Sequence, residues 1–220
     1  MPLTHMPLTT TRPSTLMMTP RRPDRRRVLT LMAGAAALAL LPVDRVWALD
    51  TTEARGLIET SLGEVYQVIN SGQPPEQMYR DFEAIFVRHA DVDVIARSAL
   101  GPVARQTGAA EFAAYKQAFQ GYIGRKYGKR FREFIGSKIE VGQARPVKSF
   151  FAVSSTAYLN GRAPMEVEWH VSDRSGRSLF FNIIIEGINM LASERAEIAA
   201  MLSRRNGDIA GLTADLQQAG

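Results

Sequence analysis

Hydrophobic side chains recur at every third or fourth position through the first part of the chain beyond residue 50, a spacing typical of amphipathic helices. Thr51 or Thr52 is placed to cap the first helix, and Gly72 is placed to end it. Pro75 stands where the next helix begins, and Gly101 follows the third. The spacing predicts four helices, over about residues 57–69, 75–89, 92–100 and 112–123.

Beyond residue 136 the period of the pattern falls to two, which is typical of strands. Four strands are predicted, over residues 138–147, 150–159, 165–171 and 179–188. Asn160-Gly161 and Ser175-Gly176 are turn residues suited to antiparallel neighbours. Helical spacing resumes over 192–205, and a short amphipathic stretch follows it. This order predicts the α+β class, with a four-stranded antiparallel sheet between N-terminal and C-terminal helices.

Two of the predicted strands differ in how their hydrophobic residues are arranged. Residues 165–171 alternate without a break, so one face meets an apolar interior and the other meets water. Residues 179–185 are apolar on nearly both faces. Such a strand either lies centrally in a packed core, which is the commoner arrangement, or lines an apolar cavity. The residues alone leave both explanations open.

The first 48 residues have the pattern of a secretory signal peptide. Arginines precede a 14-residue apolar run over 28–41, and Val46-Trp47-Ala48 offers a cleavage site after Ala48. An apolar run of this length is too short to cross about 30 Å of hydrocarbon as a helix, so stable membrane insertion is not expected. The adjacent Arg25 and Arg26 favour the twin-arginine export route. We therefore expect a cleaved leader over 1–48 and one domain over 49–220.

Setting the leader aside changes the charge balance. The whole chain has 27 Lys and Arg against 22 Asp and Glu, but seven of these basic residues and two of the acidic ones lie within 1–48. The remaining chain holds 20 of each, so it lacks the basic excess of a nucleic-acid-binding protein. Cysteine is absent, which excludes disulfides and thiolate chemistry. Only His89 and His170 remain, too few for a histidine-rich metal site.

Two groups of polar residues can be interpreted either as functional sites or as ordinary solvated surface. Glu166, Glu168 and His170 share one strand face, which suits a metal or acid–base site but is typical of a solvated outer face. The basic segment 125–132 contains interleaved aromatic residues. It suits either an ordinary amphipathic helix or a patch for lipid phosphate or an acidic protein. No common catalytic motif is present, so we do not expect an enzyme.

Several short motifs, in order and spread over about residues 53–217, resemble the MlaC family of periplasmic phospholipid-binding proteins. They are the segment 93–101, the region around Tyr127, the segment 181–191 and the stretch beginning at Arg195. The residues that match the family's motifs are Asp93, Leu100, Gly101, Tyr127, Glu186, Gly187 and Arg195. The chain departs from the usual family residues at Asn182, Asn189, Glu194 and 102–104.

The resemblance implies a monomeric periplasmic carrier with no cofactor, whose ligand is a phospholipid. Such proteins pass lipid between an outer-membrane lipoprotein and porin complex and an inner-membrane ABC transporter complex. The acyl chains are held in an apolar pocket between a curved sheet and helices. The candidates for its wall are Phe112, Phe119, Ile123, Val167, Trp169, Val171, Phe181, Ile183 and Ile185.

Two other functions stay open at this point. The first is a small exported enzyme of cone-shaped α+β fold, in which Glu166, Glu168 or His170 would converge inside a cleft. The second is an interaction adaptor without a ligand, in which the segment 125–132 would bind an acidic partner. A closed core without a pocket would favour the adaptor.

Overall fold

The structure is a computed structural model that describes residues 49–220. The predicted leader, with Arg25, Arg26 and Ala48, lies outside the described residues. The α+β class predicted from the sequence is confirmed, because six α-helices surround one antiparallel sheet within the described part. The helices are α1 Thr51–Ile69, α2 Pro75–His89, α3 Val92–Leu100, α4 Ala109–Phe131, α5 Met190–Arg204 and α6 Ile209–Gln218. Two short 3-10 helices are η1 Gly101–Arg105 and η2 Arg132–Phe134.

The sheet has the strand order β1-β2-β3-β4-β5, with every neighbouring pair antiparallel. Its strands are β1 Lys138–Val147, β2 Phe150–Tyr158, β3 Met165–Ser172, β4 Leu179–Ile185 and β5 Ile188–Asn189. Four strands were expected, and the last of them is divided. Glu186 and Gly187 both have positive φ, 50° and 76°, so the chain turns there and β5 pairs back onto β4.

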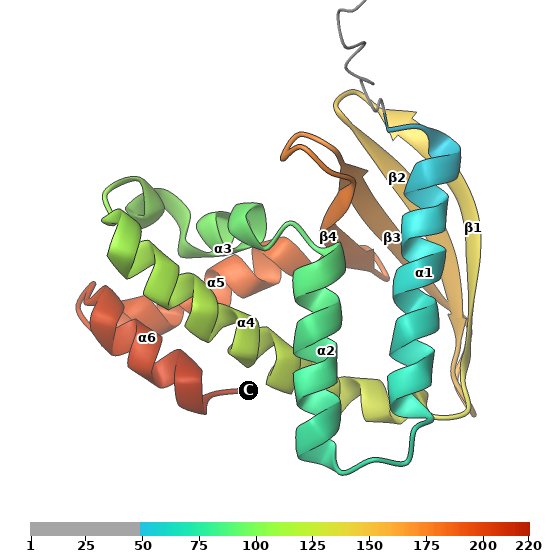
Figure 1. Cartoon of the computed structure of the whole chain (residues 1–220), viewed down its shortest axis with the longest axis horizontal. Helices are drawn as coiled ribbons and strands as arrows, with labels where there is room; N and C mark the ends of the chain where they lie inside the picture. The colour runs from blue at the N-terminus through green and yellow to red at the C-terminus, as the bar shows by residue number, and fades with distance from the viewer. Residues whose placement is uncertain (1–48) are drawn as a thin grey trace, which may run out of the picture. The chain divides into compact units, whose positions relative to one another are not determined.

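Figure 1 shows how the helices cover the sheet. α1 crosses the face formed by β1 and β2, and α2 lies beside α1. The long α4 contacts α2 along one side and α6 along another, while α3 packs against α5. α4 is therefore the element that joins the helices over the sheet to the helices at the far end of the molecule.

The first helix begins in a different way from the prediction. Asp50, not Thr51 or Thr52, is the N-cap, and its Oδ1 accepts a hydrogen bond from the Glu53 backbone N–H at 2.8 Å. Aspartate caps at least as well as threonine, and its position places both threonines in the first turn. The capping prediction was wrong by one residue.

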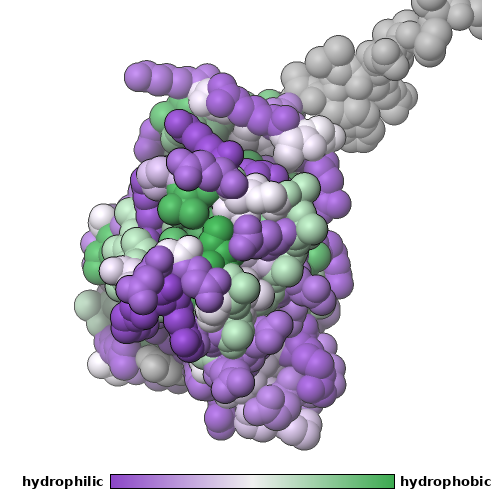
Figure 2. All heavy atoms as spheres, turned by 90° about the vertical axis from the view of Figure 1, so that its left-hand side faces the viewer, coloured by the Kyte–Doolittle hydropathy of each residue, from purple (hydrophilic) through white to green (hydrophobic). Residues whose placement is uncertain are grey.

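Most buried apolar side chains belong to one core shared by the sheet and the helices, but the buried apolar residues of α2 and of the end of α1 lie outside it. Within it, Tyr115, Phe119 and Tyr122 are almost fully buried along α4. A second, smaller cluster lies between α1 and α2 and consists of Val65, Ile69, Met78, Phe82 and Ile85. The face formed by α3, α4, α5 and α6, on the left of Figure 1, is mostly hydrophilic, with a small apolar area near its centre (Figure 2).

α2 and α4 approach each other closely because α4 has glycines at the contact. A Cβ on Gly124 would lie 2.8 Å from Glu83 Cβ and 3.1 Å from the Tyr79 backbone oxygen. A Cβ on Gly128 would lie 2.6 Å from the Tyr79 ring. These distances are shorter than van der Waals contact, so only glycine permits this spacing of the two helices.

We expect Gly124→Ala to lower the free energy of unfolding by about 1–3 kcal/mol, because the added methyl group forces α2 away from α4. Gly63 is the matched control, since it is also helical and a Cβ there meets nothing within 4 Å. Gly63→Ala should raise the free energy of unfolding by about 0.5–1 kcal/mol. Urea denaturation measures both, and equal stability of the two variants would contradict the close packing.

Candidate functional site

An apolar cavity lies between the sheet and the helices. Its volume is about 180 Å³. α1 and α2 supply one side, with Leu62, Val65, Phe82, Ile85 and Phe86. The sheet supplies the other side, and α4 and α5 supply the remaining wall. Nearly all the side chains that face this space are hydrocarbon, so the cavity is suited to an apolar ligand.

The alternation of β3 places Val167 and Trp169 in the cavity wall. The indole N–H of Trp169 donates a hydrogen bond to Ser155 Oγ at 2.9 Å, so its polar atom is satisfied and its ring is free to pack against apolar groups. The ring stacks edge-on against Phe180 of β4, with 5.5 Å between centroids. A register shift between His170 and Val171 lets β4 present both Phe180 and its neighbour to the cavity.

Six of the nine side chains proposed for the wall do line the cavity. They are Ile123, Val167, Trp169, Phe181, Ile183 and Ile185. Phe112, Phe119 and Val171 do not line it and lie in the packed core instead. Phe112 lies under the Arg97 guanidinium, 3.9 Å from the ring centroid, and Phe119 packs between Tyr115 and Tyr122.

The difference among these residues follows from their positions along each element. Phe112 and Phe119 precede Ile123 on α4 by one to three turns, toward the end covered by α3 and α6, where the interior is filled. Val171 lies beyond the β3 register shift and is fully buried. The α1 and α2 residues of the wall were recognised from the sequence only as apolar helix faces. Apolar spacing does not distinguish a face on a cavity from a face in a core.

Four of the lining residues carry polar side chains, namely Ser61, Tyr127, Asn182 and Glu194. The Ser61 hydroxyl donates to the Leu57 backbone oxygen within α1. Asn182 Oδ1 accepts from the backbone N–H of Leu191, at the start of α5, at 3.2 Å. Both side chains therefore have hydrogen-bond partners within the wall. The other two, Tyr127 and Glu194, belong to a larger network.

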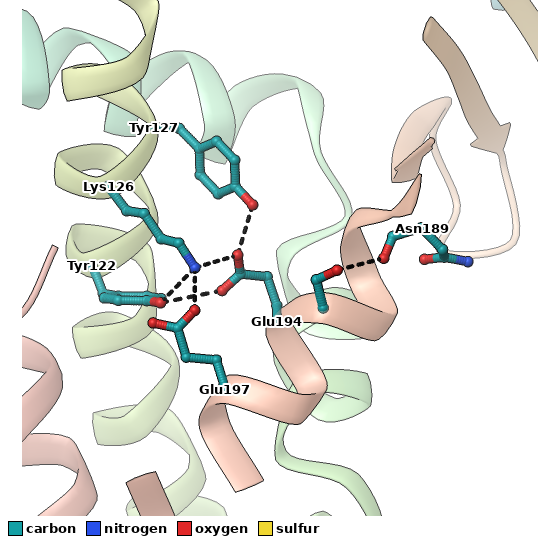
Figure 3. Close-up of polar contacts among 7 residues, drawn as sticks. Tyr122, Lys126, Tyr127, Asn189, Glu194 and Glu197 are labelled. Atoms are coloured by element: carbon teal, nitrogen blue, oxygen red, sulfur yellow. Dashed lines mark hydrogen bonds and ion pairs between the residues drawn. The ribbon is translucent and has the colours of Figure 1, made fainter. Parts of the chain in front are cut away.

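That network bridges α4 and α5 through their side chains (Figure 3). Glu194 on α5 is 4% exposed, and its Oε1 accepts from Lys126 Nζ at 2.7 Å and from the Tyr127 hydroxyl at 2.6 Å. Its Oε2 accepts from the Tyr122 hydroxyl at 3.3 Å. Lys126 also pairs with Glu197, whose side chain is 47% exposed. The network thus runs from the cavity wall to the surface.

The two phenols of the network act as hydrogen-bond donors. Burial, together with the Glu194 charge, raises the pKa of Tyr122 and of Tyr127 well above the ordinary value. Both hydroxyls therefore stay protonated at neutral pH. With Lys126 they surround a carboxylate that would otherwise be buried without partners.

The residues that match the family motifs have structural positions in this fold. Gly101 ends α3 with a φ of 72°, and the Arg195 guanidinium lies against it, so two motifs distant in sequence meet. Asp93 accepts from Arg97 Nε at 2.7 Å and from Lys116 Nζ on α4 at 3.1 Å. The remaining matches are Leu100, which is buried in the core, Tyr127 in the network, and Glu186 and Gly187 at the β4–β5 turn.

Glu166, Glu168 and His170 do not converge in the cavity. They lie on the face of β3 opposite the cavity-lining side chains, where Glu168 pairs with the exposed Arg145 at 2.8 Å. The His170 ring packs on Phe150. Among the described residues no cluster of three or more His, Asp or Glu side chains could hold a metal ion. Glu166 is exposed, whereas the His170 side chain is 13% exposed and contacts Glu168 at 2.9 Å, so this outer face is only partly solvated.

The basic segment 125–132 is partly used within the chain itself. Arg125 donates to the backbone oxygens of Leu216 and Ala219, at the end of α6. Lys126 belongs to the network with Glu194, and Lys129 bonds the Gly220 oxygen. Arg130 and Arg132 are exposed. Much of this positive charge therefore holds α6 and α5 to α4.

A family model described as MlaC protein matches residues 59–218. The chain belongs to the MlaC family. The fold is also similar to that of a phospholipid-binding protein from Ralstonia solanacearum, solved in complex with a phospholipid. The TM-score is 0.64 at 19% sequence identity, over 75% of this chain and 95% of that one. At this identity the likeness concerns the fold.

Within residues 49–220, no helix of this MlaC-family protein has the length and hydropathy needed to cross a membrane. The longest, α4, has 23 residues, but it carries charged side chains along its second half. Its apolar stripe faces the interior of the protein.

We expect Ala157→Leu in this MlaC-family protein to leave the free energy of unfolding unchanged or to raise it by up to about 2 kcal/mol. Ala157 is fully buried but lines the cavity, so three added carbons enter free apolar space. Ala96 is equally buried in the packed core away from the cavity. Ala96→Leu should therefore lower the free energy of unfolding by about 1–3 kcal/mol. Chemical denaturation compares the two, and similar losses in both would show that no usable space exists beside Ala157.

Proposed function

We propose that this protein is a phospholipid carrier that holds acyl chains in the cavity between the sheet and the helices. The observation that carries the proposal is the nearly all-hydrocarbon wall of that cavity. Membership of the MlaC family supports it, as does the similarity in fold to a protein solved with a phospholipid. Each CH₂ moved from water into such a space contributes about 0.8 kcal/mol, so binding needs no reactive group.

The size of the cavity limits what it holds without change. An apolar cavity of about 150 Å³ takes up benzene, so 180 Å³ accommodates only a portion of an acyl chain. Seating longer chains requires the walls to move apart. The wall made by Val65, Phe82 and Ile85 is the part suited to this, because these residues belong to a small cluster that is separate from the main core.

We infer that the carrier works in the periplasm as a monomer without a cofactor, passing lipid between outer-membrane proteins and an inner-membrane ABC transporter. The signal-peptide pattern of residues 1–48, with Arg25, Arg26 and Ala48, supports export through the twin-arginine route. The partners follow from family membership. The balanced charge of residues 49–220 supports the expectation that nucleic acid is not a partner.

The protein purified gently from a bacterial periplasm should contain phospholipid at about one molecule per chain or more. Mass spectrometry of an organic extract, with protein quantified in parallel, measures the ratio. Absence of stoichiometric lipid would contradict the proposed function. A second periplasmic protein of similar size, purified in the same way, controls for lipid carried over from membranes.

Ile183→Arg should reduce the lipid content several-fold, because a guanidinium facing the cavity is costly to bury beside acyl chains. Ile184 is the matched control, since it is adjacent in β4, opposes Glu168 on the other face of β3 and does not line the cavity. Ile184→Arg should retain lipid. Circular dichroism verifies that both variants fold, and equal lipid content in the two would remove Ile183 from the binding wall.

A further inference from the structure

Among the described residues that line the cavity, Glu194 is the only one with a charged side chain. Its side chain is 5% exposed, whereas Lys126 and Glu197, which share its network, are 23% and 47% exposed and do not line the cavity. A ligand inside the cavity therefore meets a carboxylate first. The ammonium group and the second carboxylate lie behind it, toward the surface (Figure 3).

The network runs from the cavity wall toward the surface, which is the direction in which a polar head group would leave an apolar space. The cavity wall there consists of Tyr127 and Glu194, and the hydrogen bonds continue outward through Lys126 to Glu197. Here α4 and α5 are joined by contacts between their side chains (Figure 3). Polar side chains therefore lie between the hydrocarbon wall of the cavity and the solvent, and their hydrogen bonds can be replaced by hydrogen bonds to a ligand.

The charges in this path distinguish between head groups. Lys126, Glu194 and Glu197 together carry one net negative charge. Arg130 and Arg204 are also near the network, but both are exposed, so water and salt screen them. A phosphate alone is repelled by the inner carboxylate. A phosphate linked to an ammonium group can place the phosphate toward Lys126 and the ammonium toward Glu194, the carboxylate in the cavity wall.

We propose that the Glu194 carboxylate gives this protein a preference for phospholipids whose head group carries an ammonium group over phospholipids with an uncharged, glycerol-type head group. The inference rests on the proposed function, because it concerns which phospholipid enters the same cavity. The sequence itself singled out Glu194 as a departure from the usual family residue, so the preference belongs to this chain rather than to the fold.

The test uses vesicles that contain equal amounts of an ethanolamine phospholipid and a glycerol phospholipid with identical acyl chains. The purified full chain is incubated with them and re-isolated, and its bound lipid is analysed by mass spectrometry. We expect the ethanolamine lipid to be enriched about fivefold, the ratio that corresponds to a modest charge–charge interaction. Glu194→Gln should bring the ratio close to that of the vesicles.

Glu197→Gln is the matched control, because it removes the same charge from the same helix at a site outside the cavity wall. It should keep most of the enrichment. If Glu194→Gln does not fold, the double variant Lys126→Met with Glu194→Met removes both charges of the ion pair together, a change that proteins often tolerate. The double variant should likewise lose the preference.

The outcomes separate this inference from the function on which it rests. No bound lipid in any preparation overturns both. Bound lipid with the composition of the vesicles in the unaltered protein overturns the inference alone. An unchanged ratio in Glu194→Gln, or an equal loss in Glu197→Gln, also overturns it, because the effect would then not arise from the carboxylate at the cavity.

Discussion

An apolar cavity inside the protein is the constraint on which the other features depend. If a cavity of about 180 Å³ were closed and held no ligand, it would cost at most about 4 kcal/mol, at ~24 cal/mol per Å³ of cavity in a protein core. That is a large part of the 5–15 kcal/mol by which domains are typically stable. The remainder of the fold must therefore be well packed. The same cost becomes a driving force for binding once a hydrocarbon ligand fills the space.

The features that keep the cavity open surround α4. Glycines at 124 and 128 let α2 approach it, while the core holds its other side through Tyr115, Phe119 and Tyr122. Arg125 attaches it to the end of α6. Because α4 is fixed by these contacts, Ile123 and Tyr127 stay at the wall although no side chain fills the space before them. α4 is thus the fixed wall against which a ligand would pack.

The sequence was sufficient to predict the α+β class, the strand positions and the apolar strand β4. It was insufficient to separate the cavity wall from the core, because Phe119 and Ile123 belong to one helical stripe and differ only in what lies opposite them. The cap of α1 was missed because Asp50 and Thr51 are both good capping residues, and the helix start decides between them. The end of β4 was not predicted, because Glu186 has a positive φ that the sequence gives little reason to expect of a residue other than glycine.

The bridge between α4 and α5 is made of charged and phenolic groups although apolar residues would close the gap at lower cost. A buried ion pair adds little net stability, because desolvation offsets its attraction. Its value must therefore lie in geometry or recognition. Glu194 is held by Lys126, Tyr122 and Tyr127 at once, so its carboxylate has a defined orientation beside a hydrocarbon wall. A charge of defined orientation at the edge of an apolar space discriminates among the polar groups of a ligand. A hydrocarbon wall can select only for the length and volume of the ligand's acyl chains.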